Sequence, residues 1–289
     1  MQSLLHEAAE TRQFLPSSPM YECTPAAYGL CKNGRRLLVL SPYPSMSSFA
    51  VTSLSLTGYA LLTPEQFVRE LDLDLTELDP LRKTWANLPR DAYLRDGGRY
   101  RSRRHSCFIQ DVGGAIVETP HRAHWQPPDY NALHGGIERW FEPIEPEVRR
   151  HPAWLRLLTA CGNLFAQLRS TPRWFIEAHQ FRIDTDEGIG RPTPEGAHRD
   201  GVDYVAVILI ERRDVRGGET RVFQAHGNTG VRFTMTDPWT ALLLDDEAVI
   251  HETTPIQPDG TSGVRDTLVL TYRAKGFQEP RAAELRIEN

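Results

Sequence analysis

Residues 194–210 read Pro-Glu-Gly-Ala-His-Arg-Asp-Gly-Val-Asp-Tyr-Val-Ala-Val-Ile-Leu-Ile, and this stretch decides the fold. From residue 202 onward it is a β-branched, apolar run, short enough for a strand that is buried on both faces. His198 and Asp200 stand where this strand begins. Because alternate residues of an extended chain project to the same side, we expect both side chains to face one point and Arg199 to face away.

Two more strands are predicted downstream. After an acidic turn at residues 245–247, residues 248–254 resume as a strand in which Val249, His251 and Thr253 share a face, which would be the interior of a barrel. The last strand covers residues 264–272. Its period of two places four residues on one side, namely Arg265, Thr267, Val269 and Thr271.

The residue types on these strands indicate a metal site. Two imidazoles and one carboxylate on one face of an ion, with the opposite face open, are the ligands of non-haem Fe(II) oxygenases. His198, Asp200 and His251 supply that set. The guanidinium of Arg265 can hold a carboxylate through two parallel hydrogen bonds, and the hydroxyl of Thr267 can add a third. This suits the distal carboxylate of 2-oxoglutarate, whose keto acid end would chelate the iron.

Four further polar residues are candidates for binding the co-substrate or the substrate. The strand at residues 176–183 places Gln180 and Arg182 on one face. They would bind the co-substrate or an amino-acid carboxylate, or else form a structural pair on the outside of the sheet. Glu195 and Asp203 could hold a substrate ammonium group, or be surface groups or neighbours of the metal ligands.

The run Arg99-Tyr100-Arg101-Ser102-Arg103-Arg104 is the one concentration of basic residues. It is either a solvated or ion-paired strand, or it brings the guanidinium of Arg101 or Arg103 to a substrate carboxylate.

Five further histidines are discounted as metal ligands, three of them as packing or loop residues. His121 and His124 have a spacing that could serve a metal on a helix, but the prolines around them leave little room for one. The others in this group are His134, His179 and His226.

Helix signals stand before and between the strands. Thr63, Pro64 and Gln66 form the N-cap, first position and capping-box partner of a predicted helix. A second helix is predicted after Pro152, with an apolar stripe that indicates packing against a sheet. The stripe consists of Trp154, Leu157, Leu158, Cys161, Leu164, Phe165 and Leu168.

The other local patterns are less regular. Prolines break up residues 1–45, which we treat as an extension, and residues 49–54 look like a strand. From residue 174 onward the pattern is one of strands separated by turns, with Gly217-Gly218 predicted to be the tip of a hairpin.

These motifs together resemble the bacterial 2OG-Fe dioxygenase family that includes L-isoleucine 4-hydroxylases. The similarity covers about residues 55 to 275 and is most specific at residues 198–204. The matching segments are residues 194–204, 216–220, 251 and 265–267, and upstream residues 88–91, 99–104, 130–131, 135–136 and 178–183.

The resemblance implies a mainly β fold with flanking helices and a double-stranded β-helix core, which is a cupin-like jelly-roll. The core would span about residues 172–275 within a single domain at residues 46–289. The implied enzyme uses Fe(II), 2-oxoglutarate and O₂ to oxidise a free amino acid or a derivative, with hydroxylation as the usual outcome and desaturation or ring closure left open. The metal roles carry over to His198, Asp200 and His251, and the co-substrate role carries over to Arg265.

Two other classes of protein would also fit a His-Asp-His site. A Zn(II) hydrolase could use the same three ligands, although it would leave Arg265 without a task. A non-catalytic barrel could sense an amino acid or 2-oxoglutarate and retain the metal for binding or stability. Formation of succinate separates the oxygenase from both.

Composition sets the remaining limits. With 33 basic and 38 acidic residues, the 289-residue chain carries no electrostatic signature of nucleic-acid binding. Its four cysteines have neither metal-site spacing nor the density of a disulfide scaffold, so we expect a reducing cytoplasm. No membrane span is expected. A small amino-acid substrate is the one partner predicted, and a homodimer is left open.

Overall fold

Antiparallel strands dominate the computed structural model, which describes residues 48–131, 133 and 135–280. These residues belong to one compact unit, Met46–Asn289. The extension expected at residues 1–45 lies outside the described residues.

The larger layer is a seven-stranded antiparallel sheet. Its central strands β5, β12 and β4 pair along nearly their whole lengths, so the sheet is continuous behind the predicted site. In spatial order the strands are β1 (Tyr59–Leu62), β9 (Ala241–Asp245), β5 (Tyr204–Arg213), β12 (Val264–Arg273), β4 (Arg173–Asp184), β2 (Arg101–Asp111) and β3 (Ile116–Glu118).

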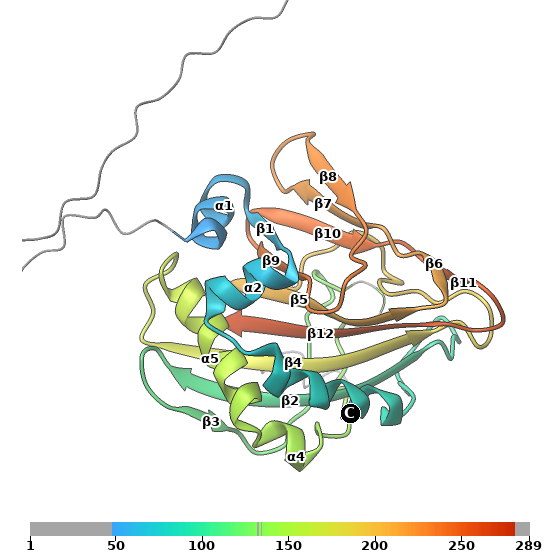
Figure 1. Cartoon of the computed structure of the whole chain (residues 1–289), viewed down its shortest axis with the longest axis horizontal. Coiled ribbons are helices and arrows are strands. Elements are labelled where there is room, and N and C mark those ends of the chain that lie inside the picture. The colour runs from blue at the N-terminus through green and yellow to red at the C-terminus, as the bar shows by residue number, and fades with distance from the viewer. Residues whose placement is uncertain (1–47, 132, 134, 281–289) are drawn as a thin grey trace, which may run out of the picture. The chain divides into compact units, whose positions relative to one another are not determined.

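The second layer is smaller and faces the central part of the first (Figure 1). Val205 and Leu242 of the large sheet pack in one buried cluster with Val222 and Val249 of the small one. Two layers of this kind form a double-stranded β-helix, so the predicted jelly-roll fold is confirmed. The small layer consists of β10 (Val249–Thr253), β7 (Thr220–Gln224) and β8 (Gly230–Phe233), with β11 (Ile256–Pro258) and β6 (Val215–Gly217) paired beside it.

Helices cover the outer face of the large sheet, where α5 crosses the strands (Figure 1). The capping box of Thr63 and Gln66 is present, and the predicted stripe is buried along α5, while its last member, Leu168, lies beyond the end of the helix and is partly buried. No helix in the described ranges is long and apolar enough to span a bilayer. The helices are α1 (Phe49–Thr57), α2 (Pro64–Leu71), α3 (Leu75–Leu78), the 3-10 helix η1 (Asp79–Asn87), α4 (Pro146–Arg149) and α5 (Pro152–Ala166).

The alternation of side chains along β4 and β12 separates the core from the site. Ile176 and Ala178 of β4 and Leu270 of β12 pack on the helix side of the sheet. The intervening residues face the space between the two layers, where polar side chains gather around a cavity. One sheet therefore supplies both the main core and one wall of the cavity.

Two local predictions are wrong. Residues 49–54 form helix α1 instead of a strand, because the side chain of Ser48 caps its first turn and Gly58 ends it in a left-handed conformation. Gly217 and Gly218 are not a hairpin tip. They connect β6 to β7, and these strands pair with β11 and β10 rather than with each other. Both glycines have positive φ, which turns the chain between the two pairs.

The contact between α5 and β2 provides a test of the packing. A Cβ added to Gly162 would lie 1.9 Å from Oε1 of Gln110, a residue that is fully buried. We expect Gly162→Ala to lower the free energy of unfolding by roughly 1 to 2 kcal/mol, because overpacking outweighs the gain in helix propensity of about 1 kcal/mol. Urea unfolding measures the change.

The double variant with Gln110→Ala is the control. Removal of the Gln110 side chain vacates the space that the new methyl group needs. The double variant should therefore lose less unfolding free energy than the two single variants lose in sum. A stabilised Gly162→Ala protein, or strictly additive effects, would contradict this contact.

Candidate metal centre and its cavity

The three predicted metal ligands come together because two backbone segments pair. His198 and His251 form an isolated antiparallel bridge, with N–H to carbonyl distances of 3.0 Å in both directions. Asp200 follows two residues later in the loop before β5. Nε2 of His198 lies 3.8 Å from Oδ1 of Asp200, and Nε2 of His251 lies 3.8 Å from its Oδ2. One ligand atom from each residue lies within 4.8 Å of the others.

The chemistry of these donors fits a divalent transition metal. Nδ1 of His198 is 3.0 Å from the carbonyl of Gly196, so it carries the proton and leaves the Nε2 lone pair for an ion. Burial holds the pKa of His251 well below its usual value, which keeps the imidazole in the neutral form that binds metals. Burial also raises the pKa of Asp200, and a cation bound beside the carboxylate would oppose that shift.

A carboxylate in the turn between β9 and β10 holds in place the loop that carries Asp200, which we call the metal loop. Asp246 is buried and accepts hydrogen bonds from the backbone N–H groups of Asp200, Gly201 and Val202 at 3.0, 2.7 and 3.1 Å. The guanidinium of Arg199 donates to the carbonyls of this same turn. The loop that carries Asp200 is thus tied to the turn that leads into the strand of His251.

Arg265 lies in the same cavity as the three metal ligands. It is 3% exposed, and its Nε and Nη2 have no hydrogen-bond partner in the part of the chain that the structure describes. Burial, together with the nearby charge of Arg212, lowers its pKa to about 10, so it remains a cation at neutral pH. A buried, unpaired guanidinium is costly, and an anionic ligand would relieve that cost. Thr267 lines the cavity beside it.

Three of the residues proposed for substrate binding also line the cavity. Nε of Arg101 is 2.8 Å from Asp91, so its charge is already paired. Arg103 lies 4.0 Å from the same carboxylate and is the freer cation. Oε1 of Glu195 is 3.7 Å from Nε2 of His198, while its Oε2 is buried and makes no hydrogen bond to a described residue.

The structure does not bring the other three to the cavity. Gln180 faces the helices and donates to Thr84 at 3.1 Å. Arg182 makes two hydrogen bonds to Asp266, at 2.8 and 2.6 Å. Asp203 pairs with Arg169 and accepts from the backbone of Ala274. Of the residues set aside as packing or loop histidines, His134 lies outside the described residues.

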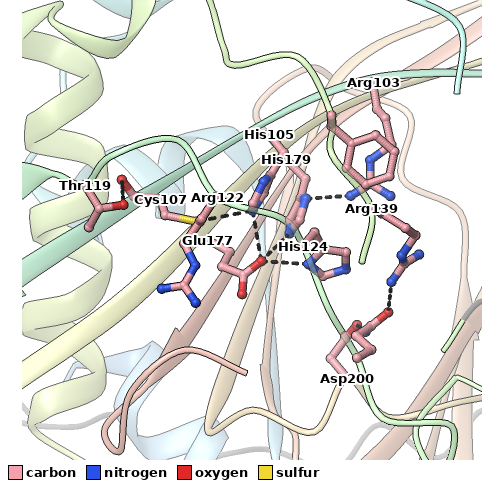
Figure 2. A network of polar contacts seen from close by, with 12 residues as sticks. Arg103, His105, Cys107, Thr119, Arg122, His124, Arg139, Glu177, His179 and Asp200 are labelled. Atoms are coloured by element: carbon pink, nitrogen blue, oxygen red, sulfur yellow. Dashed lines mark hydrogen bonds and ion pairs between the residues drawn. The ribbon is translucent and has the colours of Figure 1, made fainter. Parts of the chain in front are cut away.

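Several cavity residues were missed by the sequence reasoning, and Figure 2 shows most of them around Glu177. Glu177 and His179 belong to β4, and His124 and Arg139 pair with each other in an irregular segment. The missed signal lay in β4 itself. Because Ile176 and Ala178 are apolar, the odd-numbered polar residues should have been assigned to the cavity.

Asp246 allows a test of how the loop holds the metal. Asp246→Asn replaces one acceptor oxygen by an N–H donor that faces backbone N–H groups, so the loop should loosen. We expect the affinity for Fe(II) to fall by roughly ten- to a hundredfold, as is usual when a partner of a metal ligand is lost. Anaerobic titration calorimetry measures it. Asp245→Asn is the matched control, because that carboxylate accepts a hydrogen bond within its own turn, from Glu247 N, and none from the amides of residues 200–202. Equal Fe(II) affinities of the two variants would refute the role of Asp246 in holding the metal loop.

Comparisons with known proteins agree with this geometry. Residues 82–271 match the 2OG-Fe dioxygenase family. The crystal structure of a BsmA homolog from Methylobium petroleophilum is 55% identical, covers 80% of this chain and 94% of its own, and has a TM-score of 0.77. No curated protein matches.

Two more distant structures share the fold. IDO from Bacillus thuringiensis is 19% identical, with 78% of this chain and 98% of its own covered and a TM-score of 0.65. The Fe(II)/α-ketoglutarate-dependent dioxygenase TqaL is 18% identical, with 77% and 85% covered and a TM-score of 0.59. Since the family match spans more than half of the sequence, this chain belongs to the 2OG-Fe dioxygenase family, which uses Fe(II), 2-oxoglutarate and O₂.

Proposed function

We propose that this dioxygenase oxidises an aliphatic C–H bond of a free amino acid or an amino-acid derivative, most simply by hydroxylation, with succinate and CO₂ as co-products. One observation carries the proposal. The cavity that holds the His198, Asp200 and His251 triad also contains the buried cation Arg103 and the unpartnered carboxylate oxygen of Glu195. The cation is complementary to the carboxylate of a zwitterion, and the negative charge of Glu195 favours an ammonium group in the same cavity.

His198, Asp200 and His251 would hold the ferrous ion, and the side chain of Arg265 would hold the distal carboxylate of 2-oxoglutarate with Thr267 beside it. When bound, iron, 2-oxoglutarate and O₂ supply an oxidant strong enough for an unactivated C–H bond. The protein contributes the positions of the ion and of the co-substrate. Its three ligands leave room at the ion for small ligands, and Arg265 fixes the far end of the co-substrate.

Apolar side chains complete the cavity and exclude water from it. Phe181, Ile183, Val207 and Val269 lie among the charged groups. An aliphatic side chain can pack on these surfaces while polar groups fix the other end of the molecule. The placement of one carbon relative to the metal then decides between hydroxylation, desaturation and ring closure.

Family membership favours the oxygenase over the Zn(II) hydrolase, and the unpaired Arg265 gives the co-substrate a binding group that a hydrolase would not need. An inactive sensor of amino acids would retain the same residues. Turnover therefore separates the sensor from the enzyme.

The direct test uses the anaerobic protein with Fe(II) and 2-oxoglutarate, to which each free L-amino acid is added before O₂. We expect succinate formation to rise with at least one amino acid, and that amino acid to gain one oxygen atom or lose two hydrogens by mass spectrometry. Succinate that never depends on an added amino acid would reject the proposed substrate class.

Arg265→Leu tests the co-substrate site. The variant removes charge-assisted hydrogen bonds worth about 1.5 to 3 kcal/mol, so the KM for 2-oxoglutarate should rise roughly ten- to a hundredfold. The KM for the amino acid should change far less. Steady-state succinate assays with each substrate varied in turn measure both.

Arg213→Leu is the matched control, since it removes an exposed guanidinium from the neighbouring strand β5, where Arg213 lies near Asp214. Its two KM values should stay near those of the unaltered protein. An unchanged 2-oxoglutarate requirement in Arg265→Leu would remove Arg265 from this role.

A further inference from the structure

We propose that a buried cluster at the wall of the cavity, formed by Arg103, His105, His124, Glu177 and His179, is the subsite for the head group of a free α-amino acid. The substrate carboxylate would bind to Arg103, and its amino group would donate a hydrogen bond to His124. We name these five residues the Glu177 cluster. The inference rests on the proposed function and deepens it, because it assigns the recognition of both charged groups of the substrate.

Three imidazoles and a carboxylate could also suggest a second metal ion, since their ligand atoms lie within 4.8 Å of one another. The hydrogen bonds argue otherwise. Oε2 of Glu177 lies 2.9 Å from Nε2 of His105 and 2.7 Å from Nδ1 of His124, which are hydrogen-bond distances (Figure 2). Both rings therefore donate to the same carboxylate oxygen.

Arg103 determines the proton position on His179. Its Nη2 lies 2.6 Å from Nδ1 of His179. A guanidinium can only donate, so Nδ1 must supply the lone pair and the neutral ring carries its proton on Nε2. That Nε2 is the atom facing Glu177, at 3.8 Å. The nitrogen that a metal would need is thus protonated, and the positive charges of Arg103 and Arg139 also oppose a cation.

The cluster combines one fixed anion with neutral rings. Burial, reinforced by the charge of Arg139, lowers the pKa of His124 to about 3. Although burial alone would raise the pKa of Glu177, the hydrogen bonds from His124 and His105 hold it well below its usual value. His124 then carries its one proton on the nitrogen that faces Glu177. Its other nitrogen, Nε2, is an acceptor, and it makes no hydrogen bond within the described ranges.

Arg103 is held in place for a ligand. Its guanidinium lies between two aromatic rings, 3.8 Å from the centroid of Phe141 and 4.3 Å from that of Phe181. Together with the hydrogen bond to His179, this stacking fixes the direction of the remaining N–H groups. Asp91 compensates it only in part, since that carboxylate is shared with Arg101, which binds it at 2.8 Å, and is 4.0 Å away from Arg103. An immobile, under-compensated guanidinium is a suitable anchor for a carboxylate.

The cluster adjoins the metal site through one amide. Arg139 donates to Oε1 of Gln126 at 2.8 Å, and Nε2 of Gln126 donates to Oδ1 of Asp200 at 3.4 Å. Arg139 and His124 are paired through their backbones. A head group bound at His124 would therefore lie beside the iron ligands, with the aliphatic part of the substrate free to extend over the ion.

The test measures binding to the full chain loaded with Fe(II) and 2-oxoglutarate under anaerobic conditions. The probes are the twenty proteinogenic L-amino acids, then the methyl ester and the des-amino acid of the tightest binder. Arg103→Leu should weaken the free amino acid about ten- to a hundredfold, the loss expected for a charge-assisted hydrogen bond, but should barely affect the ester. His124→Leu should weaken the amino acid but not the des-amino acid.

Arg104→Leu is the matched control, because this neighbour on β2 is not part of the cavity lining and pairs with Glu142 at 2.8 Å. It should leave all affinities unchanged. Should Arg103→Leu fail to fold, Arg103→Lys keeps the charge but loses the paired N–H donors of the guanidinium. Several-fold weaker binding of the free acid is then expected. Equal loss for acid and ester would overturn the assignment of Arg103, and equal loss for the amino acid and the des-amino acid would overturn that of His124.

Two further outcomes separate this inference from the proposed function. Amino-acid-dependent succinate formation together with unchanged binding in Arg103→Leu would reject the subsite and leave the function standing. No binding by any free amino acid, with no amino-acid-dependent succinate, would reject both. Iron content gives an independent readout. We expect one ion per chain and none in His198→Ala, whereas an ion that survives in His198→Ala and is lost in Glu177→Gln would show a second metal site.

Discussion

The backbone pairing between His198 and His251 is the constraint on which the rest of the site depends. It joins the end of a loop to strand β10 and brings together ligands that are far apart in the chain. Because the hydrogen bonds of the bridge involve main-chain groups, both imidazoles are set by the backbone of the smaller layer. Asp200 then completes the triad from the loop that leads into β5 of the larger layer. The metal centre is therefore located where the two layers of the jelly-roll meet.

Two strands of the larger layer divide the cationic groups of the cavity by task. β12 carries Arg265, a buried cation with free donors, while β2 carries Arg103, which is fixed by aromatic rings. A buried charge is tolerated only where something compensates it, so buried guanidinium groups with unused donors in the cavity wall indicate anionic ligands. Two anchors on different strands suit two different carboxylates, one from the co-substrate and one from the substrate. The Glu177 cluster adds acceptors to the second of these.

Sequence reasoning reached the features that local patterns encode. The triad, Arg265 and Thr267 follow from the period of two along predicted strands, and the helix start at Thr63 follows from its capping box. It failed where contacts with neighbouring residues determine the local structure. Ser48 and Gly58 cap a segment whose β-branched residues looked like a strand, and on β4 the packing of α5 determines which face is core. His124 and Arg139 belong to an irregular segment, where no periodicity predicts what a side chain will face.

The turn at Asp246 has a consequence for how this scaffold can change. One carboxylate binds three successive amides of the metal loop, and the same turn leads directly into the strand of His251. Insertion or deletion of a residue there would displace two ligand-bearing segments at once. The connection between β7 and β8 is less restricted, because it leads to β8, the edge strand of the small layer. Variation in chain length should therefore accumulate at that rim, while the spacing between β9 and β10 stays constant.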